Sequence, residues 1–161
     1  YYMALLHDVG KIGVDDAILR KPGRLTDKEF SDIKNHTVIG SQILSRISSM
    51  PELQYGALYH HERWDGKGYP RGLKGEEIPE AARIIAVADA YDAMTSNRSY
   101  RKALTQDCVH DEIVNGIGRQ FWPPAARAML KMMDQDIHYD MRQKNDESSQ
   151  NDEQKYEYGI S

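Results

Sequence analysis

Hydrophobic residues recur along most of the chain at three- and four-residue steps, the period of an amphipathic helix, and no long segment alternates as a strand does. The first such pattern covers residues 2–6. A second begins at Thr26, where Thr-x-x-Glu with Glu29 forms a capping box, and its apolar face continues along one helix to Ile47. This periodicity predicts an all-α fold.

Four more helices are predicted: from about Pro51 through His60, from Pro79 through "ARIIAVADAYDAMTS", from 105 to 116 and from 123 to 133. The segment 63–79, "RWDGKGYPRGLKGEEIP", separates the first two. It is dense in Gly, which supplies positive φ, and Pro, which fixes φ, so we expect a structured loop.

Helical periodicity fades after Met133. Acidic residues outnumber basic ones from there on, and the segment from Asn145 onward is expected to be disordered. We therefore expect one domain over residues 1–133 and a polar, acidic tail over 134–161. The chain starts inside an apolar helical pattern without an initiator methionine, so we expect upstream helices to be missing and the first helix to show uncovered apolar surface.

Composition narrows the class of protein. The 161 residues, 40% hydrophobic and 29% charged, fit one globular domain. A net charge of −4 disfavours polymeric nucleic acid, which needs many Lys and Arg contacts, but allows a small phosphorylated ligand in a local basic cluster. No apolar run approaches the ~18 residues of a membrane span. The single cysteine, Cys108, excludes an internal disulfide and fits a cytoplasmic location.

Six histidines and aspartates fall on or beside the core-facing sides of these helices: His7, Asp8, His36, His60, His61 and Asp89. Any one of these histidines alone is more often an ordinary core or surface residue. Together, four imidazoles and two carboxylates are too costly to bury without metal, and two cations use them better than one. Asp8 could bridge two cations ~3.5–4 Å apart, the geometry that activates a shared hydroxide for attack on phosphorus. The set predicts phosphoester hydrolysis.

Longer motifs surround these residues. They are "HDVGKIG" (7–13), the step from His36 to Gly40, "HHERWDGKGYP" (60–70) and "IPEAARIIAVADAYDAMTSNRSYRKAL" (78–104). In order and spacing they resemble HD-GYP domains, the bacterial cyclic di-GMP phosphodiesterases of the HD phosphohydrolase superfamily, over roughly residues 3 to 105. The resemblance implies an HD-domain helical bundle with a long loop over the site. This GYP loop is the segment 63–79, which contains Gly68, Tyr69 and Pro70. It also implies hydrolysis of cyclic di-GMP to pGpG, with GMP after a second turn.

By this resemblance, the six residues fall on the family's metal-ligand positions, and the cofactors are two divalent ions, iron or manganese, which mixed imidazole and carboxylate ligation also suits. Lys11 falls where a lysine contacts the scissile phosphate and could stabilise transition-state charge, the alternative being a solvated lysine. Asp8 and Lys11 are thus the expected catalytic residues. Asp92, one turn beyond Asp89, is expected to orient a liganding imidazole.

Three further residues are assigned to the substrate by the resemblance. Arg98 and Arg101 fall on positions that hold the nucleotide, and Tyr69 of the GYP triplet is also expected to contact it. The alternative for the two arginines is a basic helix C-terminus favoured by the helix dipole.

Other interpretations stay open. The site could act on another cyclic dinucleotide or phosphoester, or the domain could be a non-catalytic module that senses cyclic di-GMP or docks on a GGDEF-domain partner through the GYP loop. A homodimer is also considered, as is a role as the cytoplasmic output domain of a longer sensory or response-regulator protein. Two departures from the family stand out: the missing upstream helices, which put a third metal in doubt, and Arg119 and Trp122 in place of Thr and Asp. No functional role is inferred from those two replacements.

Overall fold

The computed structural model of the chain describes residues 1–97 and 102–142. Within those residues it contains helices and no strand, which confirms the predicted all-α fold. The elements are α1 (Tyr2–Leu6), the 3-10 helix η1 (Val9–Gly13), α2 (Asp16–Leu19), α3 (Asp27–Lys34), α4 (His36–Leu44), α5 (Leu53–Tyr59), the 3-10 helix η2 (Gly75–Glu77), α6 (Glu80–Thr95), α7 (Gln106–Gly116) and α8 (Pro123–Gln135).

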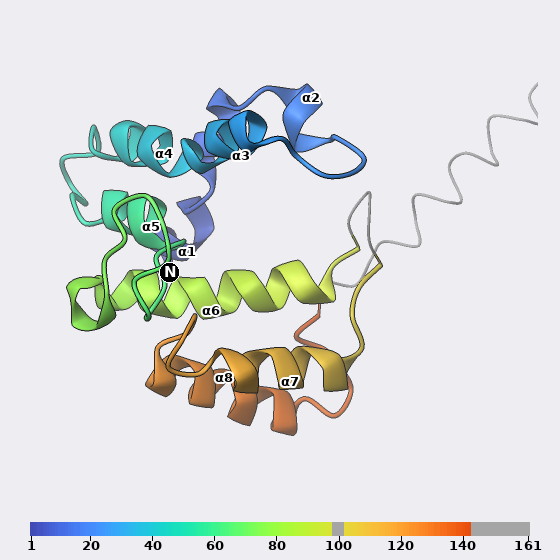
Figure 1. Cartoon of the computed structure of the whole chain (residues 1–161). Helices are drawn as coiled ribbons and strands as arrows, with labels where there is room; N and C mark the ends of the chain where they lie inside the picture. Colours follow the sequence, from blue (N-terminus) through green and yellow to red (C-terminus); the bar gives the residue numbers. More distant parts are fainter. Residues whose placement is uncertain (98–101, 143–161) are drawn as a thin grey trace, which may run out of the picture.

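Helix α6 lies in the middle of the molecule, between two groups of helices (Figure 1). Helices α3, α4 and α5 lie on one side, whereas α7 and α8 pack along the other. The larger core fills the space between α6, α7 and α8, and its buried members are Val87, Tyr91, Val109, Ile113, Phe121, Ala126 and Met133. Each large buried aliphatic or aromatic side chain stabilises the fold by about 1.5–3 kcal/mol, so this core holds α6 firmly from one side.

The predicted helix starts are confirmed at two threonines. Thr26 forms the complete capping box: its backbone N–H donates to Glu29 Oε2 at 2.7 Å, and its hydroxyl accepts from the Glu29 N–H at 3.3 Å. Thr105 caps α7 by accepting from the N–H of Cys108 at 3.4 Å. Local sequence therefore determines where these helices begin.

The prediction of one unbroken helix from Thr26 to Ile47 is wrong. Helix α3 ends at Lys34, and α4 begins at His36. Two side chains donate to the last carbonyls of α3: the His36 ring to Ile33 O at 2.5 Å and the Thr37 hydroxyl to Lys34 O at 2.9 Å. These contacts replace helical backbone bonds at the end of α3, and the contact to Ile33 O also orients the His36 ring.

The loop after α5 is tied down by the turn between α7 and α8. The N–H of Trp64 donates to Gln120 O at 3.1 Å, and the N–H of Asp65 donates to Arg119 O at 2.7 Å. The guanidinium of Arg83 lies 4.6 Å from the ring centroid of Trp122 and 5.8 Å from that of Trp64. Trp122, one of the two departures from the family motif, therefore covers Arg83 and helps hold the loop.

Helix α8 reaches Gln135, two residues beyond the predicted end, and most of the predicted tail, 143–161, lies outside the described residues. Apolar surface is present on the first helix as expected, since Leu5 is 64% exposed. No helix in the described ranges combines the length and the apolar character that crossing a bilayer requires.

Candidate metal centre

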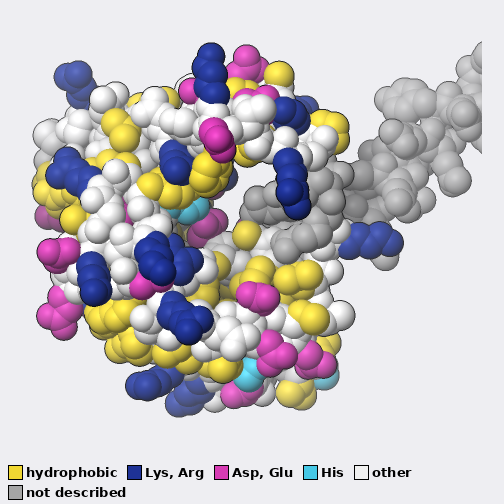
Figure 2. All heavy atoms as spheres, viewed as in Figure 1, with side chains coloured by type: hydrophobic (Ala, Val, Ile, Leu, Met, Phe, Trp, Pro, Cys, Tyr) yellow, Lys and Arg dark blue, Asp and Glu magenta, His cyan; other side chains and the backbone are white. Residues whose placement is uncertain are grey.

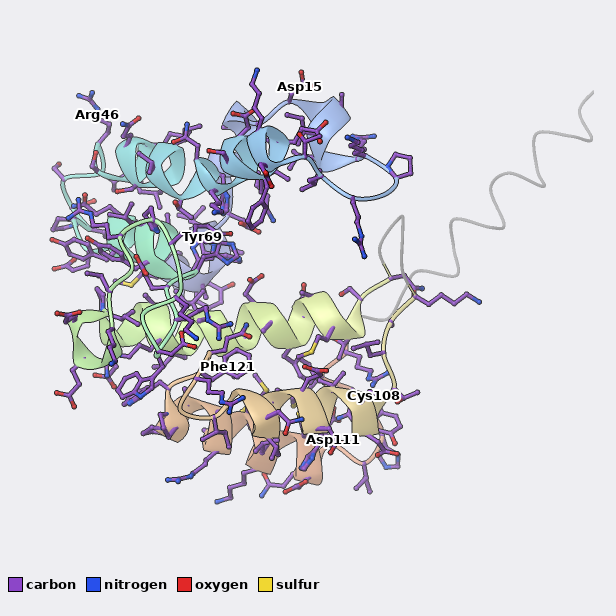
Figure 3. All side chains as sticks on the ribbon, in the orientation of Figure 1. Asp15, Arg46, Tyr69, Cys108, Asp111 and Phe121 are labelled. Atoms are coloured by element: carbon purple, nitrogen blue, oxygen red, sulfur yellow. The ribbon has the colours of Figure 1, made fainter. Side chains whose placement is uncertain are left out.

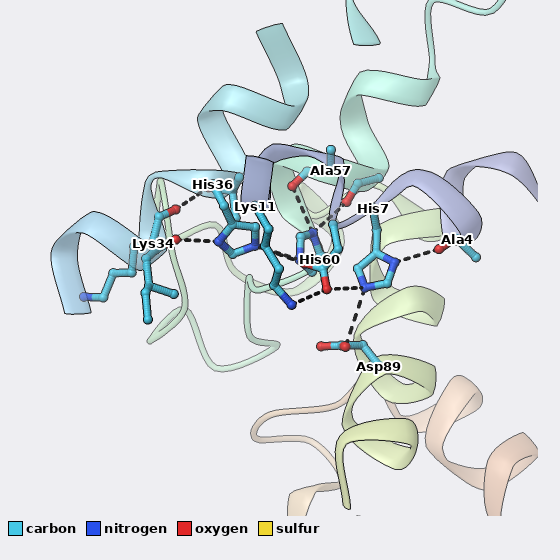
Figure 4. Close-up of polar contacts among 12 residues, drawn as sticks. Ala4, His7, Lys11, Lys34, His36, Ala57, His60 and Asp89 are labelled. Atoms are coloured by element: carbon cyan, nitrogen blue, oxygen red, sulfur yellow. Dashed lines mark hydrogen bonds and ion pairs between the residues drawn. The ribbon is translucent and has the colours of Figure 1, made fainter. Parts of the chain in front are cut away.

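Three of the predicted histidines are oriented by backbone carbonyls of the turn before them (Figure 4). The Nδ1 of His7 lies 2.6 Å from Ala4 O, that of His36 lies 2.5 Å from Ile33 O, and that of His60 lies 2.9 Å from Ala57 O. A carbonyl oxygen can only accept, so Nδ1 carries the hydrogen in each ring. The Nε2 lone pairs are thereby left for a metal ion, the arrangement that orients liganding imidazoles in metalloproteins.

Asp8 lies between these rings and faces them with both oxygens. Its Oδ1 lies 3.4 Å from Nε2 of His36 and 3.7 Å from Nε2 of His60. Its Oδ2 lies 3.4 Å from Nε2 of His7 and forms an ion pair with Lys11. One carboxylate therefore serves two neighbouring groups of side chains.

The donor atoms form two sets that meet at Asp8. Asp8, His36, His60 and His61 make one set and His7, Asp8 and Asp89 the other, and within each set the donor atoms lie within 4.8 Å of one another. Atoms bound to a common ion at ~2.1 Å stand roughly 3–3.5 Å apart, which matches most of these separations. The sequence predicted all six residues, and the structure brings them together.

Two buried polar atoms support a metal at this place. Within the described part of the chain, His7 Nε2 and Asp8 Oδ1 are buried and have no hydrogen-bond partner. Leaving such atoms unpaired costs roughly 1–3 kcal/mol each, so native structures normally supply a partner, water or ion. The residues present therefore fit a pair of cations: one would be held by the first set, the other by the second, with Asp8 common to both.

The inner histidines are neutral. Burial lowers the pKa of His60 to about 4, and the charge of His7 adds to the effect. Burial likewise lowers the pKa of His61 to about 3 and reduces the pKa of His36. Neutral imidazole is the form that binds metal, so these three rings are ready ligands throughout the physiological pH range.

The other three charged groups depend on one another. Burial alone would lower the pKa of His7, but the carboxylates of Asp8 and Asp89, 3.4 and 3.5 Å from its Nε2, raise it to about 10. Burial would raise the pKa of Asp8, yet His7 and Lys11 hold it well below its usual range. Asp89 follows the same logic, because His7 and His61 outweigh burial and lower its pKa. In the metal-free protein, His7 carries a proton that a cation would replace.

A close backbone contact brings Asp8 to His36. A Cβ built on Gly10 would lie 1.9 Å from the carbonyl oxygen of His36 and 2.4 Å from the nitrogen of Gly40. Only glycine permits this approach of η1 to α4. Gly10 of "HDVGKIG" and Gly40, four residues after His36, thus contact each other directly. This contact sets the distance between Asp8 and His36.

Two cavities meet at the centre and give access to it. One has a volume of 580 Å³ and the other 820 Å³, and both are lined by His61, Tyr69, Asp89 and Ala93. Lys11 lines the larger cavity, near its ion pair with Asp8. Figure 2 shows the hollow between the α3 layer and α6, with histidine and acidic side chains at its inner end. Cavities of this size suit small-molecule ligands.

The GYP loop is anchored directly behind the paired histidines. Glu62, 3% exposed, accepts from the N–H of Arg71 at 2.7 Å and from that of Leu73 at 3.0 Å. A Cβ on Gly68 would lie 2.4–2.5 Å from backbone atoms of residues 61–63, so the loop turns back onto the chain there. The Tyr69 ring stacks on His61, with ring centroids 4.8 Å apart and planes at 29°. In Figure 3, Tyr69 lies between α4 and α6.

The remaining predicted residues have other placements. The Asp92 carboxylate accepts a hydrogen bond from the hydroxyl of Ser96, one turn further along α6, at 3.5 Å. Its expected role in orienting an imidazole stays a prediction. Arg98 and Arg101 lie outside the described residues, so their assignment to the nucleotide also stays a prediction.

Three residues of the site were missed by sequence reasoning. Glu62 had a usable signal, since it directly follows His60 and His61 and a buried carboxylate at that point needs donors. Phe30 and Lys34 line the 580 Å³ cavity together with Tyr69. They had no signal of their own, because helical spacing alone does not say which loop will cover a helix.

Comparison with known proteins identifies the family of this chain. A family model described as "HD domain" matches residues 2–143. The chain belongs to the HD domain family. This HD domain is 48% identical, over 93% of the chain, to a protein of Thermotoga maritima named cyclic di-GMP phosphodiesterase. The family match and this relative support the resemblance to HD-GYP domains.

Two further relatives carry different names. The HD domain is 47% identical, over 80% of the chain, to a cyclic di-GMP phosphodiesterase response regulator of Xanthomonas campestris. It is 40% identical, over 82% of the chain, to 3'3'-cGAMP-specific phosphodiesterase 2 of Vibrio cholerae. The chain spans 41%, 34% and 26% of the length of the Thermotoga, Xanthomonas and Vibrio proteins.

Proposed function

We propose that this HD domain hydrolyses cyclic di-GMP to pGpG, and in a second turn to GMP, with two divalent cations, iron or manganese. The observation that carries the proposal is the shared carboxylate of Asp8, whose two oxygens face the two ligand sets. The names of the Thermotoga and Xanthomonas relatives support the substrate. Imidazole and carboxylate donors without thiolate support the choice of metals.

The residues divide the work of the reaction. When bound, the two cations supply a water nucleophile of lowered pKa and neutralise charge on the phosphate. His36, His60 and His61 would hold one ion, His7 and Asp89 would hold the other, and Asp8 would contribute to both. Lys11, paired with Asp8 and lining the larger cavity, donates to a non-bridging phosphate oxygen as negative charge develops there.

The two cavities support a substrate with two halves. They share the wall made by His61, Tyr69 and Asp89, so a phosphodiester at the centre has room for one nucleoside on each side. We propose that Tyr69 contacts one of them. Arg98 and Arg101 follow the end of α6 and are proposed to hold the nucleotide as well.

Product analysis tests this function. Reduced protein loaded with Fe or Mn is incubated with cyclic di-GMP under anaerobic conditions, and the nucleotides are separated by chromatography. We expect pGpG, followed by GMP, from the wild type and from Asp111→Ala, whose carboxylate is 81% exposed on α7. Asp8→Ala should form neither. An intact, metal-replete wild type that leaves cyclic di-GMP uncleaved contradicts the proposal.

A second candidate substrate is 3'3'-cGAMP, favoured by the name of the Vibrio relative. The ratio of kcat/KM values for the two cyclic dinucleotides decides between them. A non-catalytic sensing module is distinguished by Asp8→Ala: a sensor should keep its affinity for cyclic di-GMP and show no turnover in either form.

Partner and location are part of the proposal. Docking of a GGDEF-domain protein on the GYP loop is supported by Lys67 and Arg71, two charged residues of the loop that are exposed to solvent. A homodimer and a cytoplasmic location, as the output domain of a longer sensory or response-regulator protein, are proposed on the family resemblance and on the response-regulator name of one relative.

A further inference from the structure

The 580 Å³ cavity is lined by two chemically different groups of side chains, among others. His60, His61 and Asp89 of the candidate metal centre line one part of it. Phe30 and Lys34 of α3 line another, and Tyr69 of the loop belongs to both. The cavity therefore contacts both the candidate metal centre and a cluster of two aromatic rings and a lysine.

The aromatic wall continues from the metal centre ring by ring. Tyr69 stacks on His61, and the edge of Phe30 meets Tyr69, with ring centroids 6.5 Å apart and planes at 78°. Phe30 is 46% exposed although it is a large apolar side chain. An exposed aromatic ring at the wall of a cavity is suited to stack on a flat ligand.

Lys34 is held against this wall without an acidic partner. Its Nζ lies 4.4 Å from the centroid of the Phe30 ring and 5.5 Å from that of Tyr69. Within the described residues it forms no ion pair, whereas Lys11 pairs with Asp8 and Lys21 pairs with Glu29. Its three N–H donors remain available to a ligand that the rings also contact.

These features match a purine with acceptors on its edge. Aromatic rings stack on any base, but a lysine discriminates, because it donates hydrogen bonds and cannot accept them. Guanine offers two acceptors, O6 and N7, on one edge, whereas adenine offers N7 beside the N6 amino donor. An ammonium group can therefore donate to both acceptors of guanine. On adenine it can donate to N7 only, and it meets the N6 amino donor beside it.

We propose that Phe30, Lys34 and Tyr69 form a base subsite for one guanine of the substrate, and that Lys34 selects guanine over adenine. This inference rests on the proposed function, since it assigns one nucleoside of cyclic di-GMP to the 580 Å³ cavity. It goes further by naming the residue that separates cyclic di-GMP from adenine-containing cyclic dinucleotides. The other guanine occupies the 820 Å³ cavity.

Substitutions of Lys34 with different hydrogen-bonding capacity test the assignment. The readouts are KM for cyclic di-GMP and the inhibition constant of cyclic di-AMP, measured on metal-loaded protein. Lys34→Arg keeps the donors and should keep the preference for guanine. Lys34→Gln, whose amide can pair with adenine N6 and N7, should lower the selectivity for guanine by about tenfold or more. Phe30→Leu should weaken binding of both nucleotides alike, because stacking does not distinguish bases.

Lys28 provides the matched control, since it is an exposed lysine on the same helix. Lys28→Gln should leave KM and selectivity as in the wild type. Hydrolysis of bis(p-nitrophenyl) phosphate, which carries no purine, should suffer far less from Lys34→Gln than hydrolysis of cyclic di-GMP. Thermal melts of all variants verify that they fold. If Lys34→Gln does not fold, Lys34→Arg provides the test. Loss of selectivity for guanine in Lys34→Arg would contradict the assignment.

Failure of this inference differs from failure of the proposed function. If the wild type cleaves cyclic di-GMP and Lys34→Gln retains its selectivity, the base subsite is wrong and the proposed function stands. If the metal-loaded wild type cleaves bis(p-nitrophenyl) phosphate but not cyclic di-GMP, the proposed function is wrong and the base subsite is rejected with it.

Discussion

The two oxygens of Asp8 face different partners, and this single side chain joins the two halves of the centre. Oδ1 faces His36 and His60, and Oδ2 faces His7 and Lys11. The sequence predicts that Asp8 bridges two metal ions, because it is a carboxylate among residues of ligand type, and that role stays a prediction. Which oxygen faces which ring could not be predicted, since that depends on how η1 packs on α4.

Lys11 can be tested apart from the metals. Lys11→Met removes the ammonium group and leaves all six proposed ligands in place, so the metal content should stay unchanged. We expect kcat for cyclic di-GMP to fall about 10²–10³-fold, the usual effect of losing one donor to developing charge. Lys28→Met is the control. A Lys11→Met enzyme with wild-type kcat shows that the lysine is a solvated ion-pair partner.

Glu62 is predicted to stabilise the conformation of the GYP loop. Its carboxylate accepts two backbone N–H groups of residues 71 and 73, and Glu62→Gln removes the charge and one acceptor. We expect unfolding free energy to fall by about 1–3 kcal/mol and the amides of Arg71 and Leu73 to exchange faster with solvent. Hydrogen exchange measured residue by residue checks this. Glu76→Gln, exposed in the same loop, should leave both amides protected.

At the scale of elements, the contact between η1 and α4 is the most demanding. Gly10→Ala places a methyl group 1.9 Å from the carbonyl oxygen of His36, where only backbone could move away. The overpacking should lower the free energy of unfolding by about 1–3 kcal/mol or more and weaken metal binding, because Asp8 and His36 are pushed apart. Urea unfolding and metal titration measure the two effects.

Gly13→Ala is the matched control for this contact. The added methyl group would lie 2.7 Å from Cδ1 of Ile39, which is the flexible end of a side chain and can rotate away. Its destabilisation should be clearly smaller than that of Gly10→Ala. Equal losses in the two variants mean that η1 does not depend on a close backbone approach.

The start of α3 gives a pH prediction. Hydrogen bonds from Lys21, and next from the Thr26 N–H, lower the pKa of Glu29 to about 2 from an ordinary value of 4.5. Because the folded-state pKa is depressed, the stabilisation is present above about pH 4.5 and is lost as the pH falls toward 2. The stability difference between wild type and Glu29→Gln should therefore shrink between pH 5 and pH 2, as measured by urea unfolding.

The step between α3 and α4 shows what periodicity cannot supply. The apolar face through Ile33, Gly40 and Ile47 predicts one helix, whereas the capping box at Thr26 and the start of the helix near Thr105 were predicted correctly. The break arises because the His36 ring and the Thr37 hydroxyl take carbonyls of α3. Such a choice depends on the space around His36, which is tertiary information.

At the scale of the whole molecule, the six proposed ligands come from four separate segments. His7 and Asp8 precede η1, His36 begins α4, His60 and His61 follow α5, and Asp89 lies on α6. The sequence predicted these six residues because buried imidazoles and carboxylates need a common partner. It did not predict Phe30 and Lys34 beside Tyr69, because the path of the GYP loop decides that contact.

Metal should stabilise the whole domain, because the ions would link segments that are otherwise held by small cores. A ligand at 100-fold excess over its Kd stabilises by about 2.7 kcal/mol per site, which corresponds to a rise in Tm of roughly 5–10 °C for a domain of this size. Scanning calorimetry with and without a chelator measures the shift. An unchanged Tm argues against metal at these residues.

Metal analysis tests the central claim, that Asp8 joins two metal sites in one centre. Protein purified anaerobically and saturated with Fe or Mn is desalted, and the ions per chain are counted for wild type, Asp8→Ala, His36→Ala and Asp111→Ala. We predict about two ions in the wild type and in Asp111→Ala, about one in His36→Ala, and weakened occupancy of both sites in Asp8→Ala. A wild type that holds a single ion, or an Asp8→Ala variant that still holds two, contradicts the account.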